Sequence, residues 1–313
     1  ASEWVEGRHR GLLAHLIVAT VDQLLYAATR TKFVSVRHAG LAGKVLIIDE
    51  VHAYDVYMSV FLHDLLTWCA GASVPVVLMS ATLPPALRDH LIAAYRRGLP
   101  GAPTRRDEPD QEPAPGPSGY PIITTATSEG VSAVTTQPHR ADLMVDVEQS
   151  GTDPDDLDAL AARVEAESSD GGCILVILDT VARAQGVFER LRGHGVPTRL
   201  LHGRLTTASR AERTKELVDL LGDRRTRESG RPERLVVVAT QIAEQSFDVD
   251  ADLLVTDLAP TDLLLQRIGR LHRHDRPAAD RPAALRDPRV VVILSLIHIS
   301  EPTRRTPLSY AVF

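Results

Sequence analysis

The stretch from Lys44 to Met58, KVLIIDEVHAYDVYM, constrains this chain more than any other part of its sequence. Its mainly β-branched run ends at Ile48 and is followed at once by two carboxylates, Asp49 and Glu50. This pattern predicts a buried parallel strand whose C-terminal end presents both carboxylates. Ligands of open α/β sheets bind beyond the carboxyl ends of the strands, where an acidic pair can hold Mg²⁺ and activate water against a phosphate. The alternative is an acidic turn that only solvates the end of a strand.

The 313 residues suffice for two domains, and a hydrophobic content of 44% lets each build a core. The net charge of −6 gives no general basic surface for nucleic acid, so such contacts must depend on local patches and backbone amides. Cys69 and Cys173 lack the paired spacing of metal ligands, and we expect both to be reduced core residues of a cytoplasmic protein. We expect neither a membrane span nor a signal peptide.

A second buried strand is predicted from Val74 to Met79, and Ser80-Ala81-Thr82 follows it. Hydroxyl groups at that edge can link the acidic pair to other groups, or Ser80 and Thr82 can cap the helix predicted from Pro85 to Arg97. Residues 1–99 therefore predict one α/β domain.

Upstream, the string VATVDQLL places Thr20 and Asp22 before a short helical run, where both residue types are common N-caps. Arg37 has two interpretations of equal weight, a contact to a phosphate or a solvated surface arginine.

Residues 100–119 include six prolines and three glycines, which indicates a linker or an exposed insertion. Beyond it, strands and helices alternate, which predicts a parallel, doubly wound sheet in a second domain at residues 120–293. The predicted strands are Leu143–Val147, Cys173–Leu178, Thr198–Leu201 and Leu235–Ala239, and the predicted helices are Asp153–Glu167, Val181–Arg192 and Ala208–Leu221.

Two segments of this second domain carry candidate chemistry, Thr240–Asp248 and Gln266–Arg273. Arg270 and Arg273 are three residues apart, so on one helical turn both can face a triphosphate. A solvated basic face is the alternative. A metal site at His272 and His274 is rejected because no acidic or cysteine ligands accompany them.

The order VATVDQ, DEVHAYD, SATLP, LLHGR, VATQIAEQSFDVD, QRIGRLHRH resembles the helicase portion of the CRISPR-associated helicase–nuclease of type I systems, a superfamily 2 DExH-type helicase. The resemblance runs from about Trp4 to Arg273. Its most specific parts are DEVHAYD and the block EQSFDVD to QRIGRLHRH.

The resemblance implies two RecA-like lobes that hydrolyse ATP with Mg²⁺ in a cleft and move 3′→5′ along single-stranded DNA. The intact family protein is recruited by a CRISPR surveillance (Cascade-type) complex during antiviral defence. The rival interpretations are another superfamily 2 translocase, such as a restriction subunit, and a catalytically silent module that binds nucleic acid. Gene neighbours would test the restriction-type translocase, and an ATPase assay of an intact version would test the silent module.

The resemblance also assigns residues. Asp49 would hold Mg²⁺ with Glu50, which would polarise the attacking water. Asp248 would contact the ribose, and Arg270 and Arg273 would be arginine fingers. The remaining assignments are to coupling or to contact with DNA: His52, Gln266, Thr20, Ser80, Thr82, His202, Arg204 and Thr240.

The sequence departs from the family in two respects. Asp179 stands where the family usually has Asn, which puts the usual amide contact in doubt. The phosphate-binding pattern GxxxxGK[ST] does not occur in the 313 residues, so we expect a truncated first lobe and no activity of this chain alone. The family's nuclease and C-terminal domains also have no counterpart, and the start at Ala1 is consistent with processing or with a missing start.

The tail at residues 294–313 has a separate interpretation. Leu294–Arg304 and Ser309–Phe313 can be written in codons that resemble two parts of a transposon-end adapter used in sequencing libraries. We therefore expect an artefact rather than a domain. The alternative is a genuine amphipathic tail, because LSLIHIS alternates apolar and polar residues, and the nucleotide sequence would decide between them.

Overall fold

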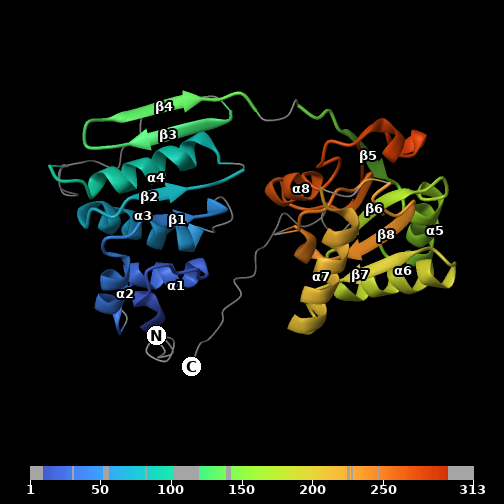
Figure 1. Cartoon of the computed structure of the whole chain (residues 1–313), viewed down its shortest axis with the longest axis horizontal. Coiled ribbons are helices and arrows are strands. Elements are labelled where there is room, and N and C mark those ends of the chain that lie inside the picture. The colour runs from blue at the N-terminus through green and yellow to red at the C-terminus, as the bar shows by residue number, and fades with distance from the viewer. Residues whose placement is uncertain are drawn as a thin grey trace. The chain divides into compact units, whose positions relative to one another are not determined.

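The computed structural model describes residues 10–29, 32–51, 56–81, 83–101, 120–138, 142–223, 226, 228–244 and 247–294. The chain divides into two compact units, unit 1 (Ala1–Ala141) and unit 2 (Asp142–Phe313), shown in Figure 1. Most of the predicted linker and nearly all of the predicted tail lie outside the described residues. No helix in the described part of the chain is long and apolar enough to cross a membrane.

Unit 1 is built around two parallel strands, each followed by a helix. Strands β1 (Leu46–Ile48) and β2 (Val76–Leu78) pair in register, and α3 (Val56–Gly71) and α4 (Pro85–Arg97) follow them. The preceding elements are η1 (Arg10–Leu13), α1 (Val21–Leu25), η2 (Tyr26–Ala28) and α2 (Val34–Leu41).

The core of unit 1 lies on one face of this small sheet. Ile48 packs there with residues of α3 such as Leu65 and with Leu91 of α4. The other face is open to solvent, because Ile47 is 61% exposed and Val77 is 43% exposed. Successive strand residues point to opposite faces, so the prediction of a fully buried strand is correct for one face only.

A two-stranded antiparallel hairpin completes unit 1. Strands β3 (Ile122–Ala126) and β4 (Val131–Thr135) pair Ile123 with Val134, and β3 lies against α4 (Figure 1). The boundary predicted at residue 120 is therefore wrong. The hairpin packs on the first unit, and the division falls after Ala141.

Unit 2 contains a six-stranded sheet in which every pairing is parallel, with strand order β5-β10-β9-β6-β8-β7. This confirms the prediction of a doubly wound α/β fold. Its strands are β5 (Asp146–Ser150), β6 (Gly172–Ile177), β7 (Thr198–Leu201), β8 (Arg234–Ala239), β9 (Leu253–Asp257) and β10 (Arg289–Ile293). Its helices are α5 (Leu157–Glu167), α6 (Val181–Gly193), α7 (Thr207–Leu221), α8 (Thr261–Ile268) and the short η4 (Gln241–Ala243), η5 (Ala278–Asp280) and η6 (Ala283–Leu285).

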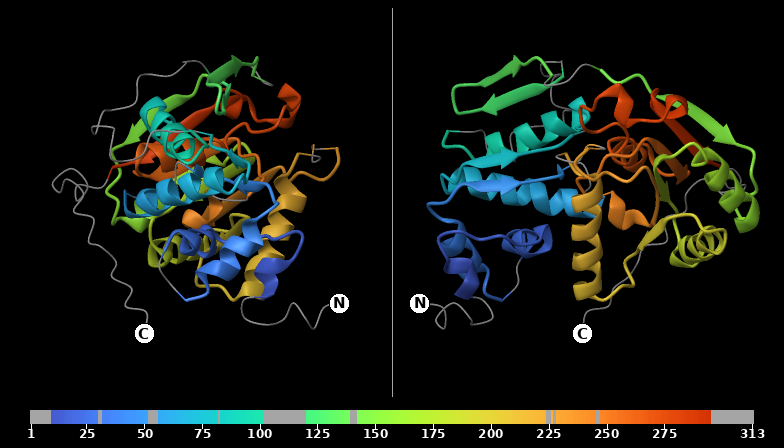
Figure 2. Two further views of the ribbon diagram at one scale, coloured as in Figure 1. Left: turned by 90° about the vertical axis from the view of Figure 1, so that its left-hand side faces the viewer. Right: turned by 45° about the vertical axis from the view of Figure 1, so that its right-hand side comes forward.

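Both faces of the central part of this sheet are covered, which is why β6, β8 and β10 are almost continuously apolar. Helices α5 and α6 pack on one face and α7 packs on the other (Figure 2). All six residues of β6 are buried. Parallel strands of this kind place all their carboxyl ends at one edge of the sheet, which is where ligands of such sheets bind.

Two element boundaries differ from the predictions for identifiable reasons. Helix α5 begins at Leu157 rather than Asp153, because the Asp156 side chain accepts a hydrogen bond from Ala159 N at 2.9 Å and caps the helix there. Strand β5 begins at Asp146 rather than Leu143, because its pairing with β10 starts opposite Arg289.

Gly172 supplies a test of the packing in unit 2. Its φ of +97° is a left-handed conformation, and an added Cβ would lie 2.6 Å from Leu285 Cδ1. Gly172→Ala should therefore lower the free energy of unfolding of unit 2 by about 2 kcal/mol or more, from backbone strain together with overpacking. Urea unfolding measures this loss.

Gly193→Ala is the matched control, since an added Cβ at Gly193 meets no atom within 4 Å. Equal stability of the two variants would show that the close packing around Gly172 is wrong.

Candidate functional site

The acidic pair of unit 1 projects from the carboxyl end of β1, as the sequence predicts. Met79 N donates to Ile48 O at 2.9 Å, and Val51 N donates to Met79 O at 3.2 Å. The strand pairing therefore resumes at Val51, and Asp49 and Glu50 stand exposed between these two contacts.

The backbone at the acidic pair is strained. Glu50 has a φ of 54°, in the left-handed region, and its N donates to Asp49 Oδ1 at 2.9 Å. Non-glycine residues in that region are uncommon and tend to occur at functional sites. Exposed carboxylate oxygens at such a strand end are the ligand type that Mg²⁺ takes, so these two residues fit the predicted metal role.

Ser80 lies at the same edge, because it follows Met79 and Met79 bonds to both sides of the acidic pair. It is half-buried. Helix α4 begins after the N-cap Pro84, so Ser80 lies too far upstream to cap it, and that alternative is wrong. His52 and Thr82 lie outside the described residues.

Thr20 occupies the N-cap position of α1, but its side chain makes no capping hydrogen bond and is exposed. Arg37 matches neither of its predicted interpretations. It is 9% exposed, its Nη1 donates to Gln23 O at 2.6 Å, and its guanidinium lies 5.2 Å from the centre of the Tyr26 ring. Arg37 therefore packs α2 against α1 and η2.

In unit 2, His202 and Thr240 follow the adjacent strands β7 and β8. Thr240 N donates to Leu201 O at 3.1 Å, so the two residues lie at one edge, and each is 4% exposed. Burial, with help from Arg213 and Arg204, lowers the pKa of His202, so its ring is neutral at pH 7. Arg204 is exposed in the turn that follows His202.

A buried network that the sequence did not predict joins the same edge to α8. Arg267 is 1% exposed, and its guanidinium contacts Glu244 Oε1 at 2.7 Å, Thr256 Oγ1 at 2.7 Å and Asp179 Oδ1 at 3.1 Å. Asp179 thus binds an arginine of the segment from Gln266 to Arg273. Charge alternation along the chain gives no sign of these contacts, because the partners are 11 to 88 residues apart.

The two candidate finger arginines do not share a helical turn, so this prediction is wrong. Helix α8 ends at Ile268, and Gly269 is its C-cap. Arg270 Nη2 donates to Glu244 O at 2.6 Å, whereas Arg273 Nε donates to Asp248 Oδ1 at 2.6 Å. Of the three predicted site residues Gln266, Arg270 and Arg273, only Gln266 lies on α8, where it is half-buried.

The structure brings Arg273 and Asp248 together at the surface, with side chains 39% and 54% exposed. Both were predicted to contact nucleotide. His274 Nε2 lies 3.3 Å from the same Asp248 oxygen. Among the described residues, no group of three or more His, Cys, Asp or Glu side chains is arranged to hold a metal ion.

The chain is similar to known proteins over most of its length. The family model "CRISPR-associated nuclease/helicase Cas3, C-terminal" matches residues 170–276. The CRISPR-associated nuclease/helicase Cas3 of Streptococcus thermophilus is 36% identical over 87% of this chain and 28% of its own length. The crystal structure of T. fusca Cas3-ATP matches with a TM-score of 0.81 at 36% identity, over 94% of this chain and 34% of that one.

The chain matches the helicase portion of Cas3 proteins in both sequence and fold. It also matches a chain of a CRISPR RNA-guided surveillance complex, pre-nicking, with a TM-score of 0.77 and 36% identity, over 94% of this chain and 36% of that one. The chain spans about a third of the length of these Cas3 proteins. The match to the Cas3 family model includes Asp179, Thr240, Asp248 and the segment from Gln266 to Arg273.

Arg267→Met tests the buried network. The change leaves Glu244 as a buried carboxylate without its ion pair, which should cost about 3–5 kcal/mol of unfolding free energy near pH 7. Burial, opposed by Arg267, already raises the pKa of Glu244. A carboxyl whose pKa is higher in the folded state favours folding as the pH falls, and loss of Arg267 raises this pKa further. The loss should therefore shrink between about pH 7 and about pH 5 in urea unfolding.

The control is the same Arg267→Met change made in a protein that already carries Glu244→Gln, because a neutral amide needs no cation. There Arg267→Met should cost less and show little dependence on pH. An equal loss in both backgrounds would assign the stabilisation to Thr256 and Asp179 instead.

Proposed function

We propose that this chain is the motor portion of a Cas3-type enzyme that hydrolyses ATP and moves 3′→5′ along single-stranded DNA in type I CRISPR interference. The observation that carries the proposal is the acidic pair, exposed beyond β1 with Glu50 in a left-handed conformation. The names of the matched proteins, among them T. fusca Cas3-ATP, support the choice of nucleotide.

Unit 1 supplies the hydrolytic carboxylates. In this proposal Asp49 holds Mg²⁺ with Glu50, and the ion neutralises phosphate oxygens when it is bound. Glu50 accepts a proton from the attacking water and orients it towards the γ-phosphate. His52 follows the pair in sequence and couples it to the rest of the site.

Unit 2 supplies positive charge. Arg270 and Arg273 stabilise the charge that spreads over the transferring phosphoryl group, and Asp248 accepts hydrogen bonds from the ribose. The exposed Arg273–Asp248 pair supports this assignment, because both side chains are accessible to a ligand and an ion pair so exposed costs little to open. Gln266, four residues before Arg270, couples the nucleotide to α8.

The DNA contacts of unit 2 lie at the carboxyl edge of its sheet. Exposed Arg204 contacts phosphate, while buried, neutral His202 and Thr240 shape the edge beside it. Thr20, Ser80 and Thr82 are the corresponding candidates of unit 1. The segment from Thr240 to Asp248 couples the two activities, because Glu244 O, midway along it, accepts the hydrogen bond of Arg270.

The intact protein acts in the cytoplasm with a Cascade-type surveillance complex as its partner. A matched chain of a surveillance complex supports this part of the proposal. The 313-residue sequence has no GxxxxGK[ST] segment to cradle the β- and γ-phosphates, so we propose that residues 1–313 alone do not hydrolyse ATP. Tests of turnover therefore need a longer version that carries such a loop.

Glu50→Gln in that longer version tests the acidic pair. The amide keeps the shape of the side chain but loses the charge that orients and deprotonates water, so ATP turnover should fall to background while ATP and DNA still bind. Turnover is measured by phosphate release, and binding by fluorescence anisotropy.

Glu129→Gln changes an exposed carboxylate in the hairpin of unit 1 and is the matched control, with turnover unchanged. Near-normal turnover of Glu50→Gln would refute the role of Glu50.

Arg270→Ala and Arg273→Ala test the fingers. Each should reduce turnover by about 10³-fold or more while single-strand affinity changes little, because the guanidinium acts on charge that develops at the phosphoryl group. Arg192→Ala, at an exposed position of α6, is the control for the loss of one positive charge. Loss of DNA binding with retention of turnover would assign both arginines to DNA instead.

A further inference from the structure

We propose that His272 is a positioning residue that sets the directions of Arg270 and Arg273, and that Asp250 and Asp252 hold its segment in place. This inference rests on the finger role proposed for the two arginines. It assigns a function to the most heavily charged buried cluster of unit 2, which the proposed reaction does not use directly.

The backbone turns sharply at His272. Its φ of 45° lies in the left-handed region, between two arginines whose side chains bond to different partners. A β-carbon makes this conformation unfavourable, so the surrounding contacts must impose it. The turn separates the direction of Arg270, towards Glu244 O, from that of Arg273, towards Asp248.

The imidazole anchors this turn. His272 is 8% exposed, and its Nε2 lies 3.3 Å from the carbonyl oxygen of Asp252. A carbonyl oxygen only accepts hydrogen bonds, so Nε2 carries the proton. Burial and Arg281 lower the pKa of His272, which keeps the ring neutral at pH 7.

Main-chain hydrogen bonds from Ala251 also hold the turn at His272. Ala251 N donates to Arg270 O at 2.9 Å, and His272 N donates to Ala251 O at 3.0 Å. Ala251 and Leu271 thereby form an isolated parallel bridge, and Leu271 is 1% exposed. The segment from Arg270 to His272 is therefore bound to Ala251, and the position of Ala251 depends on the two residues that flank it, Asp250 and Asp252.

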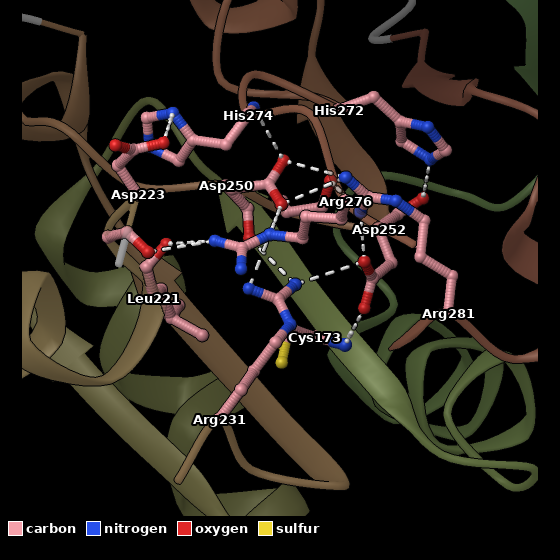
Figure 3. A network of polar contacts seen from close by, with 12 residues as sticks. Cys173, Leu221, Asp223, Arg231, Asp250, Asp252, His272, His274, Arg276 and Arg281 are labelled. Atoms are coloured by element: carbon pink, nitrogen blue, oxygen red, sulfur yellow. Dashed lines mark hydrogen bonds and ion pairs between the residues drawn. The ribbon is translucent and has the colours of Figure 1, made fainter. Parts of the chain in front are cut away.

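These flanking residues are fixed by charge. Figure 3 shows Arg231, Arg276 and Arg281 pointing towards Asp250 and Asp252. Asp250 accepts hydrogen bonds from Arg276 Nε and from Arg281 Nη2 at 2.9 Å. Asp252 accepts them from Arg231 Nη2 at 3.0 Å, from Arg281 Nη1 and from Cys173 N at 2.7 Å.

The Asp250 carboxylate remains charged in this buried position. Burial alone would raise the pKa of Asp250, but Arg281, Arg231 and Arg276 together lower it. Asp250 also lies 3.5 Å from His274 N, and Arg276 Nη2 donates to Gly222 O at 2.8 Å at the end of α7. The cluster therefore holds both ends of the segment from Arg270 to Arg276.

The test compares three substitutions at His272. Asn tolerates a left-handed backbone and keeps a short polar side chain, Gly tolerates the backbone but loses the anchor, and Ala loses both. In the longer version of the protein, His272→Ala should lower the kcat of ATP hydrolysis by about 10²-fold, since small displacements of catalytic groups cost that much. KM for ATP should change by less than about threefold.

Rescue separates positioning from simple stability. His272→Asn should recover at least about tenfold of the lost kcat, and His272→Gly should remain lower than Asn. His194→Ala, a surface histidine paired with Glu165, is the control and should retain full kcat. Equal kcat of the Ala and Asn variants would overturn the inference.

A second readout needs no turnover. In the 313-residue chain, the Nε–H of Arg273 donates to Asp248 Oδ1, which should give its NMR signal a chemical shift distinct from that of a solvated arginine. His272→Ala should abolish that distinct signal while the amide signals of β6 and β8 persist. Its persistence would also overturn the inference.

The outcomes distinguish the two proposals. If Arg270→Ala and Arg273→Ala keep full turnover, the finger assignment fails first. If those variants lose turnover while His272→Ala keeps kcat and the Arg273 signal, the finger role stands and only the positioning role of His272 is refuted.

Discussion

The constraint on which unit 2 depends is that its central strands β6, β8 and β9 are buried on both faces, so the charged groups that meet these strands do so at their ends. Strands β6 and β9 are buried along their whole length, and β8 is buried except at Arg234. The carboxyl end of β6 leads to Asp179, and its amino end meets Asp252 through the amide of Cys173. Each end carries a cluster of arginines and carboxylates, because a buried charge is tolerated only when it is paired.

One stretch of chain connects these two clusters. It leaves β8 at Thr240, supplies Glu244 to the network around Arg267, presents Asp248 at the surface, and returns through Asp250 to the start of β9. The segment after α8 runs beside it, and Arg270 and Arg273 each bond to it. A displacement at Thr240 therefore has a covalent and hydrogen-bonded route to both arginines, which is what coupling of DNA contact to ATP hydrolysis requires.

The sequence was sufficient wherever a feature depends on local pattern. The apolar run before Asp49 predicted a strand with the acidic pair at its end, and the alternation after residue 142 predicted the parallel sheet. It was insufficient wherever distant residues meet. Nothing near Arg37 predicts its contact with Gln23 and Tyr26, and nothing near Arg267 predicts its bond to Asp179. The helical turn expected for Arg270 and Arg273 is wrong for the same reason, since α8 ends at Ile268 and Leu271 pairs instead with the distant Ala251.

Backbone strain distinguishes the two candidate segments from the ordinary turns of the fold. Among the described non-glycine residues with positive φ, Phe33 precedes α2, and Ser73 ends α3 in a turn where Val74 N donates to Cys69 O at 2.8 Å. The conformation of Ser73 is expected at the C-terminal end of a helix, where it satisfies terminal carbonyl groups, and Phe33 is the N-cap of α2. Glu50 and His272 have no such role. Glu50 follows a strand directly, and His272 lies between two arginines beyond a helix that has already ended.

A conformation that the local fold does not require persists only when other contacts impose it. At Glu50 the strand pairing on both sides fixes the turn, and at His272 a buried ring and a charged cluster fix it. In the proposed reaction, these two turns would aim charged side chains, a carboxylate in unit 1 and a guanidinium in unit 2. Rigid aiming of this kind removes reorganisation from the chemical step, which is the contribution a protein can make to phosphoryl transfer.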